Sequence, residues 1–124
     1  MIINIGVDIV EIDRICRILN RNKNFLKFIL GETELSQLKI RNFPVASIAA
    51  NFSGKEAFLK TFGWSINSID FRDVQIIRCF QGKPEFLFSG KIKEIIKKND
   101  FNFFISLTHS NNIACAVVVC EKRT

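Results

Sequence analysis

The sequence contains no tyrosine, a single tryptophan and a single histidine. Its thirteen phenylalanines are mostly spaced as core residues. They do not form the exposed basic and aromatic surface on which single-stranded nucleic acid stacks. One histidine without a second histidine or a cysteine pair is a poor zinc site. These absences argue against a nucleic-acid module and against structural zinc.

Cysteine pairs and long apolar runs are also missing. No C-x-x-C motif occurs among the four cysteines, which are Cys16, Cys79, Cys115 and Cys120. Buried thiols in a reducing compartment explain this usage. No apolar run approaches the about 20 residues that span a bilayer. Asp8 and Glu11 interrupt the first apolar stretch too early for a signal peptide. We therefore expect a cytoplasmic protein without a membrane-spanning segment.

The charge balance is basic, with 18 Lys+Arg against 12 Asp+Glu, a net charge of +6 and a pI near 9.4. Such a surface attracts an anion, but charge alone does not separate nucleic acid, an acidic protein and a phosphorylated small molecule. A length of 124 residues with 48% hydrophobic residues is enough for one core. We expect a single domain over residues 1–124.

Hydrophobic periodicity predicts a mixture of strands and helices. The first expected strand ends near Ile9, and the other four span residues 69–78, 85–88, 101–108 and 113–121. The expected helices run from Val10 onward, over 25–30, from 33, from Pro44 to a stop at Gly63, and over 91–98. Because regular βαβ alternation is missing, the order favours a single α+β domain, with a mostly antiparallel sheet packed by one long helix and shorter helices.

Two carboxylates occupy positions where the backbone is rigid. Asp8 follows the first strand, and Glu56 lies one turn before Lys60 on the long helix. Together they are typical of a two-carboxylate magnesium site for phosphate chemistry. Simpler interpretations remain open: Asp8 can cap the following helix, and Glu56 with Lys60 can be an exposed ion pair worth about 0.3–0.5 kcal/mol.

Three further groups are candidate contacts for an anionic ligand. His109 ends a predicted strand between Thr108 and Ser110, and this combination of imidazole and hydroxyls suits a phosphate. Residues Gly82, Lys83 and Pro84 are typical of a hairpin turn, with a ligand contact as the alternative. One helical stripe is either a solvated face or a docking face for an acidic partner, and it consists of Arg14, Arg17 and Arg21.

Four segments together resemble the holo-acyl-carrier-protein synthase family, the small 4′-phosphopantetheinyl transferases: residues 6–15, 52–60, 82–84 and 106–110. They occur in family order and cover essentially the whole chain. The resemblance implies that the 4′-phosphopantetheine group of coenzyme A is transferred to a serine of apo-acyl-carrier protein for fatty acid biosynthesis. Adenosine 3′,5′-bisphosphate is then released.

The resemblance also implies roles for single residues. Asp8 and Glu56 match the magnesium-binding carboxylates, and Lys60 matches a lysine directed at the phosphates. The proton acceptor is either Glu56 or a water on the metal. The 3′-phosphate contacts match His109, Thr108 and Ser110, and the nucleotide lies near Gly82, Lys83 and Pro84.

Family members are typically trimers, with coenzyme A in clefts between subunits. The resemblance implies that an acidic carrier protein docks on the basic helix, where Arg14 best matches the family pattern and Arg17 and Arg21 follow from helical spacing. Two positions depart from the pattern. Asn51 replaces a usual arginine and removes one expected phosphate contact. Gly54 replaces alanine or a larger residue, at a cost of about 1 kcal/mol in helix propensity.

Two alternative functions make different predictions. A small basic module that binds RNA predicts steep salt dependence and dispensable Asp8 and Glu56. A noncatalytic partner of carrier-protein assemblies predicts coenzyme A binding without modification of the carrier.

Overall fold

The computed structural model of the chain describes residues 1–62 and 69–123. In chain order its elements are β1 (Ile2–Glu11), α1 (Ile12–Arg21), α2 (Phe25–Ile29), α3 (Glu32–Ile40), α4 (Val45–Lys60), a 3-10 turn (Phe71–Asp73), β2 (Val74–Arg78), β3 (Pro84–Phe88), α5 (Gly90–Lys98), β4 (Phe101–His109) and β5 (Ile113–Lys122). Every strand pairing is antiparallel, in one sheet of order β1-β5-β4 and one hairpin of β2 and β3. The predicted α+β architecture is confirmed.

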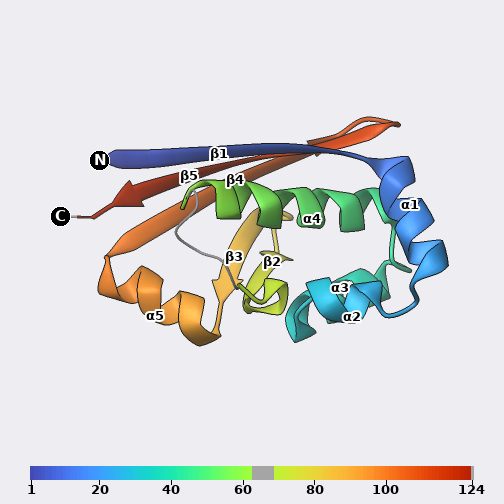
Figure 1. Ribbon diagram of the computed structural model, residues 1–124, viewed down its shortest axis with the longest axis horizontal. Coiled ribbons are helices and arrows are strands. Elements are labelled where there is room, and N and C mark those ends of the chain that lie inside the picture. Colours follow the sequence, from blue (N-terminus) through green and yellow to red (C-terminus); the bar gives the residue numbers. More distant parts are fainter. Residues whose placement is uncertain (63–68, 124) are drawn as a thin grey trace.

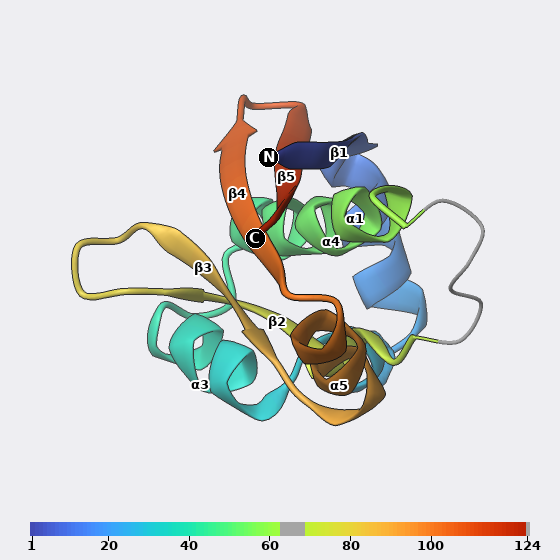
Figure 2. The same cartoon turned by 90° about the vertical axis from the view of Figure 1, so that its left-hand side faces the viewer.

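Helix α4 forms the middle layer of the molecule. The three-stranded sheet covers one side of it, and α3, α5 and the β2–β3 hairpin lie on the other side (Figures 1 and 2). Its first half packs with α1, α2 and α3 in one apolar cluster, and its second half packs with β2, α5 and β5 in another. The two halves of α4 are therefore buried in different apolar clusters, and its two sides face different layers of the molecule.

The close approach of sheet and helix depends on small residues. Ala114 and Ala116 are buried on the side of β5 that faces α4. A Cβ added at Gly6 of β1 would overlap the carbonyl oxygen of Ala57. Because that atom belongs to the helix backbone, only glycine lets β1 cross α4 here. This crossing brings Asp8 against α4.

Several boundaries differ from the sequence-based expectation. Strand β1 continues to Glu11, so Asp8 lies within the strand, in register with Ala116. The strand expected over 69–78 begins at Val74, because the Asp70 carboxylate accepts a hydrogen bond from the Arg72 N–H and starts a 3-10 turn. The expected helix stop at Gly63 lies outside the described residues.

The outer face of the three-stranded sheet is apolar. Ile5, Val7 and Ile9 alternate with residues that face α4, and they are 62%, 53% and 61% exposed. Phe104 and Val117 add 50% and 38% exposed side chains from the neighbouring strands. We call these five residues the outer face. Within the described part of the chain, no helix has the length and apolar character to cross a membrane.

Candidate active site

Asp8 is held between strand β1 and helix α4. Its Oδ1 lies 3.3 Å from Lys60 Nζ, and the Ser53 hydroxyl donates to it, with Oγ 3.1 Å from Oδ2 and 3.0 Å from the Asp8 carbonyl oxygen. Lys60 Nζ also donates to the Val7 carbonyl at 3.0 Å. The Asp8 side chain is 16% exposed and that of Lys60 is 56% exposed. The carboxylate is thus fixed from two sides and still open to solvent.

Glu56 lies on the same side of α4, between Ser53 and Lys60 in the sequence. It is half-buried, and its side chain makes no hydrogen bond or ion pair within residues 1–62 and 69–123. Burial and then the Asp8 carboxylate raise the pKa of Glu56, whereas Lys60 and Arg14 lower it. The two carboxylates repel each other, and a bound cation would relieve that repulsion.

The donor set fits a hard divalent cation. Each Asp8 oxygen accepts one hydrogen bond, which leaves lone pairs on both. No group of three or more His, Cys, Asp or Glu side chains converges anywhere in the described residues. Mg²⁺ is commonly held by one or two carboxylates, with waters and substrate phosphates completing its shell. Asp8 and Glu56 together meet that need.

The simpler interpretations of these residues are wrong. Helix α1 begins at Ile12 with Glu11 at its N-cap and no side-chain cap hydrogen bond, so Asp8 does not cap it. The side-chain ion pair of Lys60 is made with Asp8 and not with Glu56. The side chains of Asp8 and Lys60 therefore belong to the contact between β1 and α4.

The predicted basic stripe of α1 is exposed and adjoins the carboxylates. Arg14, Arg17 and Arg21 are all exposed. Arg14 lowers the pKa of Glu56 by its charge. Arg14 and Arg17 also line a hollow of about 470 Å³ beside the end of β1. The start of α1 thus places one cation, Arg14, near Glu56.

Gly82 and Lys83 lie in the predicted hairpin turn, and Pro84 begins β3 directly after it. The Gly82 N–H donates to the Cys79 carbonyl at 2.8 Å, and Gly82 has φ +84°, which favours glycine. Lys83 and Pro84 also line a hollow of about 480 Å³ beside β3, β4 and α5. The turn interpretation is confirmed, and the ligand contact stays a prediction.

His109 ends β4 on the exposed side of the β4–β5 hairpin, next to Thr108. The Ser110 hydroxyl accepts from the N–H groups of Asn112 and Ile113 and so shapes the turn. Strand β5 separates His109 from Asp8, and two strand spacings amount to about 10 Å. One chain brings Asp8, Glu56, Lys60 and Arg14 together, whereas it keeps His109 and the Lys83 turn apart from them.

A buried polar network on another side of α4 was not predicted. Lys55 and Glu34 are both 0% exposed and form an ion pair of 2.7 Å. Lys55 Nζ also donates to the carbonyls of Phe71 at 2.8 Å and Val74 at 2.7 Å. Burial raises the pKa of Glu34 and lowers that of Lys55, and their mutual attraction opposes both shifts. This pair fixes α3 and β2 to α4.

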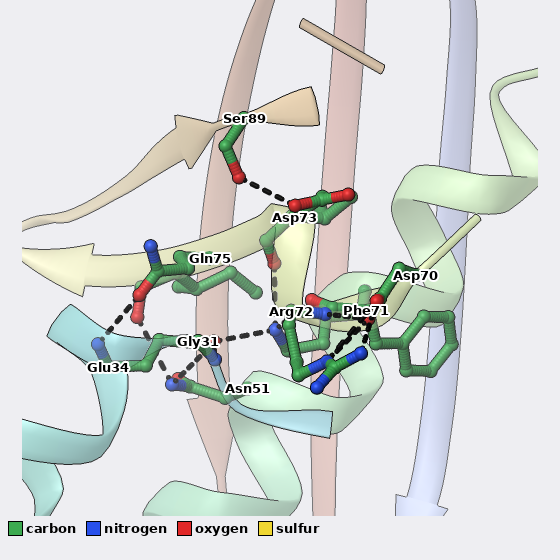
Figure 3. Close-up of polar contacts among 12 residues, drawn as sticks. Gly31, Glu34, Asn51, Asp70, Phe71, Arg72, Asp73, Gln75 and Ser89 are labelled. Carbon is green, nitrogen blue, oxygen red and sulfur yellow. Dashed lines mark hydrogen bonds and ion pairs between the residues drawn. The ribbon is translucent and has the colours of Figure 1, made fainter. Parts of the chain in front are cut away.

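Asn51 belongs to the same network. Its Nδ2 donates to Glu34 Oε2 and to the Ile76 carbonyl, both at 3.1 Å. Figure 3 shows Glu34, Asn51 and Gln75 turned toward one another from α3, α4 and β2. The replacement of an expected arginine by Asn51 therefore supplies a core contact.

Gly54 has a packing role that helix propensity does not describe. A Cβ at this position would press on the terminal methyl groups of Ile76 and Ile105. The destabilisation expected from helix propensity alone therefore leaves out the steric clash that an alanine side chain would cause at this position. Ser53 was also not predicted, although a usable signal existed, because Ser53, Glu56 and Lys60 follow helical spacing.

Comparison with known proteins supports one family. A family model of the 4′-phosphopantetheinyl transferase superfamily matches residues 4–118. The holo-[acyl-carrier-protein] synthase of Clostridium perfringens strain 13 is 39% identical over 126 residues, which is 98% of this chain and 95% of that protein. This chain belongs to the 4′-phosphopantetheinyl transferase superfamily.

Solved structures of the family agree with the fold. The holo-[acyl-carrier-protein] synthase of Neisseria meningitidis is 32% identical with a TM-score of 0.90, over 98% of this chain and 100% of that one. The Bacillus anthracis synthase, solved in complex with CoA (3′,5′-ADP), is 30% identical with a TM-score of 0.80, over 99% of both chains. The predicted family membership and enzyme class are confirmed.

Proposed function

We propose that residues 1–124 form one transferase domain that moves the 4′-phosphopantetheine group of coenzyme A onto a serine of an apo-acyl-carrier protein. The convergence of Asp8, Glu56 and Lys60 at the contact of β1 with α4 carries this proposal. The Bacillus anthracis relative was solved with CoA (3′,5′-ADP), which supports the same substrate here. The four free thiols fit a cytoplasmic enzyme.

Asp8 and Glu56 would hold Mg²⁺. When bound, the ion neutralises charge on the pyrophosphate of coenzyme A. Lys60 assists from the same side: two of its three N–H donors go to Val7 and Asp8, which leaves one for a phosphate oxygen. Its exposed side chain lets a ligand approach that donor.

Glu56 is the proton acceptor in this proposal. The serine oxygen forms a bond to the phosphorus next to the pantetheine, and the bond from that phosphorus to the adenosine-side phosphate breaks. The serine proton passes to Glu56, and adenosine 3′,5′-bisphosphate leaves. The half-buried position of Glu56 next to Asp8 carries this assignment, because a bound cation would oppose the raised pKa that Glu56 has in the metal-free chain.

The carrier protein would dock on α1. Arg14, Arg17 and Arg21 are exposed cations of α1, and Arg14 acts on Glu56 by its charge. An acidic carrier would be steered to these cations, and its serine would then lie near the carboxylates. Arg17→Glu should raise the KM for the carrier and weaken its salt dependence, with the KM for coenzyme A unchanged. An unchanged KM for the carrier would remove Arg17 from the docking face.

A homotrimer would complete the site. The outer face of the sheet exposes five large apolar side chains in one patch, and such patches mark interfaces. A neighbouring subunit could bring His109, Thr108 and Ser110, or the Gly82–Lys83–Pro84 turn, to the Asp8 of the first. Native mass spectrometry should find a trimer that Ile5→Lys converts to monomers with lost activity. A monomeric active wild type would contradict this assembly.

The deciding experiment measures the intact mass of an apo-acyl-carrier protein after incubation with this protein, coenzyme A and Mg²⁺. We expect the gain of one phosphopantetheine group, abolished by chelator and by Asp8→Ala or Glu56→Ala. Glu94→Ala, at an exposed carboxylate on α5, is the matched control and should stay active. Unmodified carrier, under conditions where another transferase modifies it, would falsify the proposal.

A further inference from the structure

Ser53 is a buried polar residue on the side of α4 that contacts β1. It lies three positions before Glu56 in the helix, and it is 0% exposed. Serines inside helices usually point to solvent or donate to the carbonyl one turn earlier. The Ser53 hydroxyl oxygen instead lies 3.1 Å from Asp8 Oδ2 and 3.0 Å from the Asp8 carbonyl oxygen. Both contacts therefore reach one residue of a distant strand.

These two contacts fix the orientation of the Asp8 carboxylate. A hydroxyl has one hydrogen to donate, so Oδ2 and the carbonyl oxygen share it. Without that hydrogen, two oxygens of negative partial charge would lie near each other with no common donor, and a buried acceptor without a donor is unfavourable. The carboxylate would then turn away from its own backbone. The buried hydroxyl prevents this rotation.

Lys60 contacts the same carboxylate in a different way. Its Nζ lies 3.3 Å from Asp8 Oδ1, and its side chain is 56% exposed, whereas Ser53 is fully buried. A long, exposed lysine has many rotamers and gains little from such a contact. Its positive charge also repels a cation that Asp8 would hold. Of these two contacts to the Asp8 side chain, that of Ser53 is the rigid and uncharged one.

The close approach of β1 to α4 lets a side chain as short as serine reach Asp8. Two residues before Asp8, a Cβ added at Gly6 would overlap the Ala57 carbonyl oxygen of the helix. One Cβ and one hydroxyl are therefore enough to connect the two elements at Asp8. Since a serine side chain has few rotamers, little conformational entropy is lost when it fixes the carboxylate.

We propose that Ser53 is a positioning residue, whose hydroxyl holds the Asp8 carboxylate in the orientation in which Asp8 and Glu56 take a divalent cation. The inference rests on the proposed function, which assigns these two carboxylates to Mg²⁺. Groups that hydrogen-bond a metal-binding side chain change metal affinity without touching the metal, typically by about 10-fold to 100-fold. Ser53 acts in this way, because its hydroxyl contacts Oδ2 and leaves Oδ1 to other partners.

Titration with Mn²⁺, which takes the same oxygen ligands as Mg²⁺, measures this effect without the transfer reaction. Electron paramagnetic resonance of the free ion gives the Kd. Ser53→Ala should bind Mn²⁺ about 10-fold more weakly than the wild type, and its transfer rate should need about 10-fold more Mg²⁺ for half-saturation. Ser47→Ala removes another buried hydroxyl from the same helix. It is the matched control and should bind Mn²⁺ as the wild type does.

Two further measurements separate positioning from a merely structural role. Urea unfolding shows that each variant is folded, and a merely structural hydroxyl would lower the urea midpoint while the Kd for Mn²⁺ stayed the same. Lys60→Ala removes the other contact to the Asp8 side chain together with a positive charge. It should bind Mn²⁺ at least as tightly as the wild type, opposite to Ser53→Ala.

The inference is overturned if Ser53→Ala binds Mn²⁺ as Ser47→Ala does, or if Lys60→Ala loses as much affinity as Ser53→Ala. Failure of the proposed function has a different signature. A wild type that leaves the carrier unmodified, with Mn²⁺ binding that Ser53→Ala weakens, loses the transferase and keeps the role of Ser53. A wild type that modifies the carrier, with unchanged Mn²⁺ binding in Ser53→Ala, keeps the transferase and loses that role.

Discussion

Lys55 and Lys60 lie on the same helix and meet opposite surroundings. Lys55 is fully buried and its amino group has three acceptors, the Glu34 carboxylate and two backbone carbonyls. Lys60 is 56% exposed and binds one carbonyl and one carboxylate, and its third N–H has no partner among the described residues. A saturated cation holds the core, whereas an unsaturated one can still receive a ligand. The difference lies in the partners, not in the residue type.

The carboxylates of the two regions follow the same division. Glu34 accepts from the Gly31 N–H, from Asn51 and from Lys55. Glu56 has no such partner among the described residues, and the nearby Asp8 raises its pKa after burial does. The candidate site thus differs from the buried side of α4 in having a carboxylate, that of Glu56, without a hydrogen-bond or ion-pair partner among the described residues.

The largest effect is expected at Glu56. Glu56→Gln keeps the shape and removes the charge, so the transfer rate should fall by about 10²–10⁴-fold, the usual contribution of a positioned base. Steady-state transfer to the carrier measures this loss. Its urea midpoint should not fall below that of the wild type, because the charge is unfavourable in the folded state. A lower midpoint would assign Glu56 to the core instead.

The comparison of the two lysines is sharpest in stability. Lys55→Ala should lose about 3–5 kcal/mol, because Glu34 is left buried without its cation. Lys60→Ala should lose less than about 1 kcal/mol, as for other exposed pairs, and lower the transfer rate. Urea unfolding of both variants checks the order. Equal losses in the two variants would erase the distinction between the two sides of α4.

The pH dependence isolates Glu56. Because its pKa is raised in the folded chain, the folded state binds more protons than the unfolded one above the ordinary carboxyl pKa. This contribution to wild-type stability is present at low pH and is lost as the pH rises through the raised pKa. Unfolding from about pH 4 to pH 7 should show Glu56→Gln gaining on the wild type as the pH rises. If the stability of Glu56→Gln relative to the wild type falls as the pH rises, the raised pKa of Glu56 is contradicted.

The smallest effect is expected at Gly54. Gly54→Ala gains about 1 kcal/mol in helix propensity and loses a similar amount by crowding Ile76 and Ile105, so the net change should stay within about 1 kcal/mol. Gly6→Ala should lose more than about 2 kcal/mol, because its Cβ meets the backbone of Ala57. Thermal unfolding of the pair tests whether rigid backbone or movable methyl groups decide the cost.

Local spacing was enough to place Asp8 on the first strand and Glu56 and Lys60 one turn apart on the long helix, whereas their assignment to one site came from the pairing of two carboxylates and from the family resemblance. The partners of these residues could not be predicted in the same way. Ser53 reaches Asp8 only because Gly6 lets β1 cross α4, and Lys55 reaches Glu34 across 21 positions of sequence. Alternation placed the apolar residues of β1 on one face, but nothing local showed that this face points away from α4.

Four successive residues of α4 each serve a different neighbour. Ser53 donates a hydrogen bond to Asp8, and Gly54 leaves space for the Ile76 side chain. Lys55 forms an ion pair with Glu34, and Glu56 is half-buried near Asp8. Successive helical positions are turned by about 100°. A single inserted or deleted codon before Ser53 would therefore redirect all four at once. This segment can change by replacement, but its length is fixed.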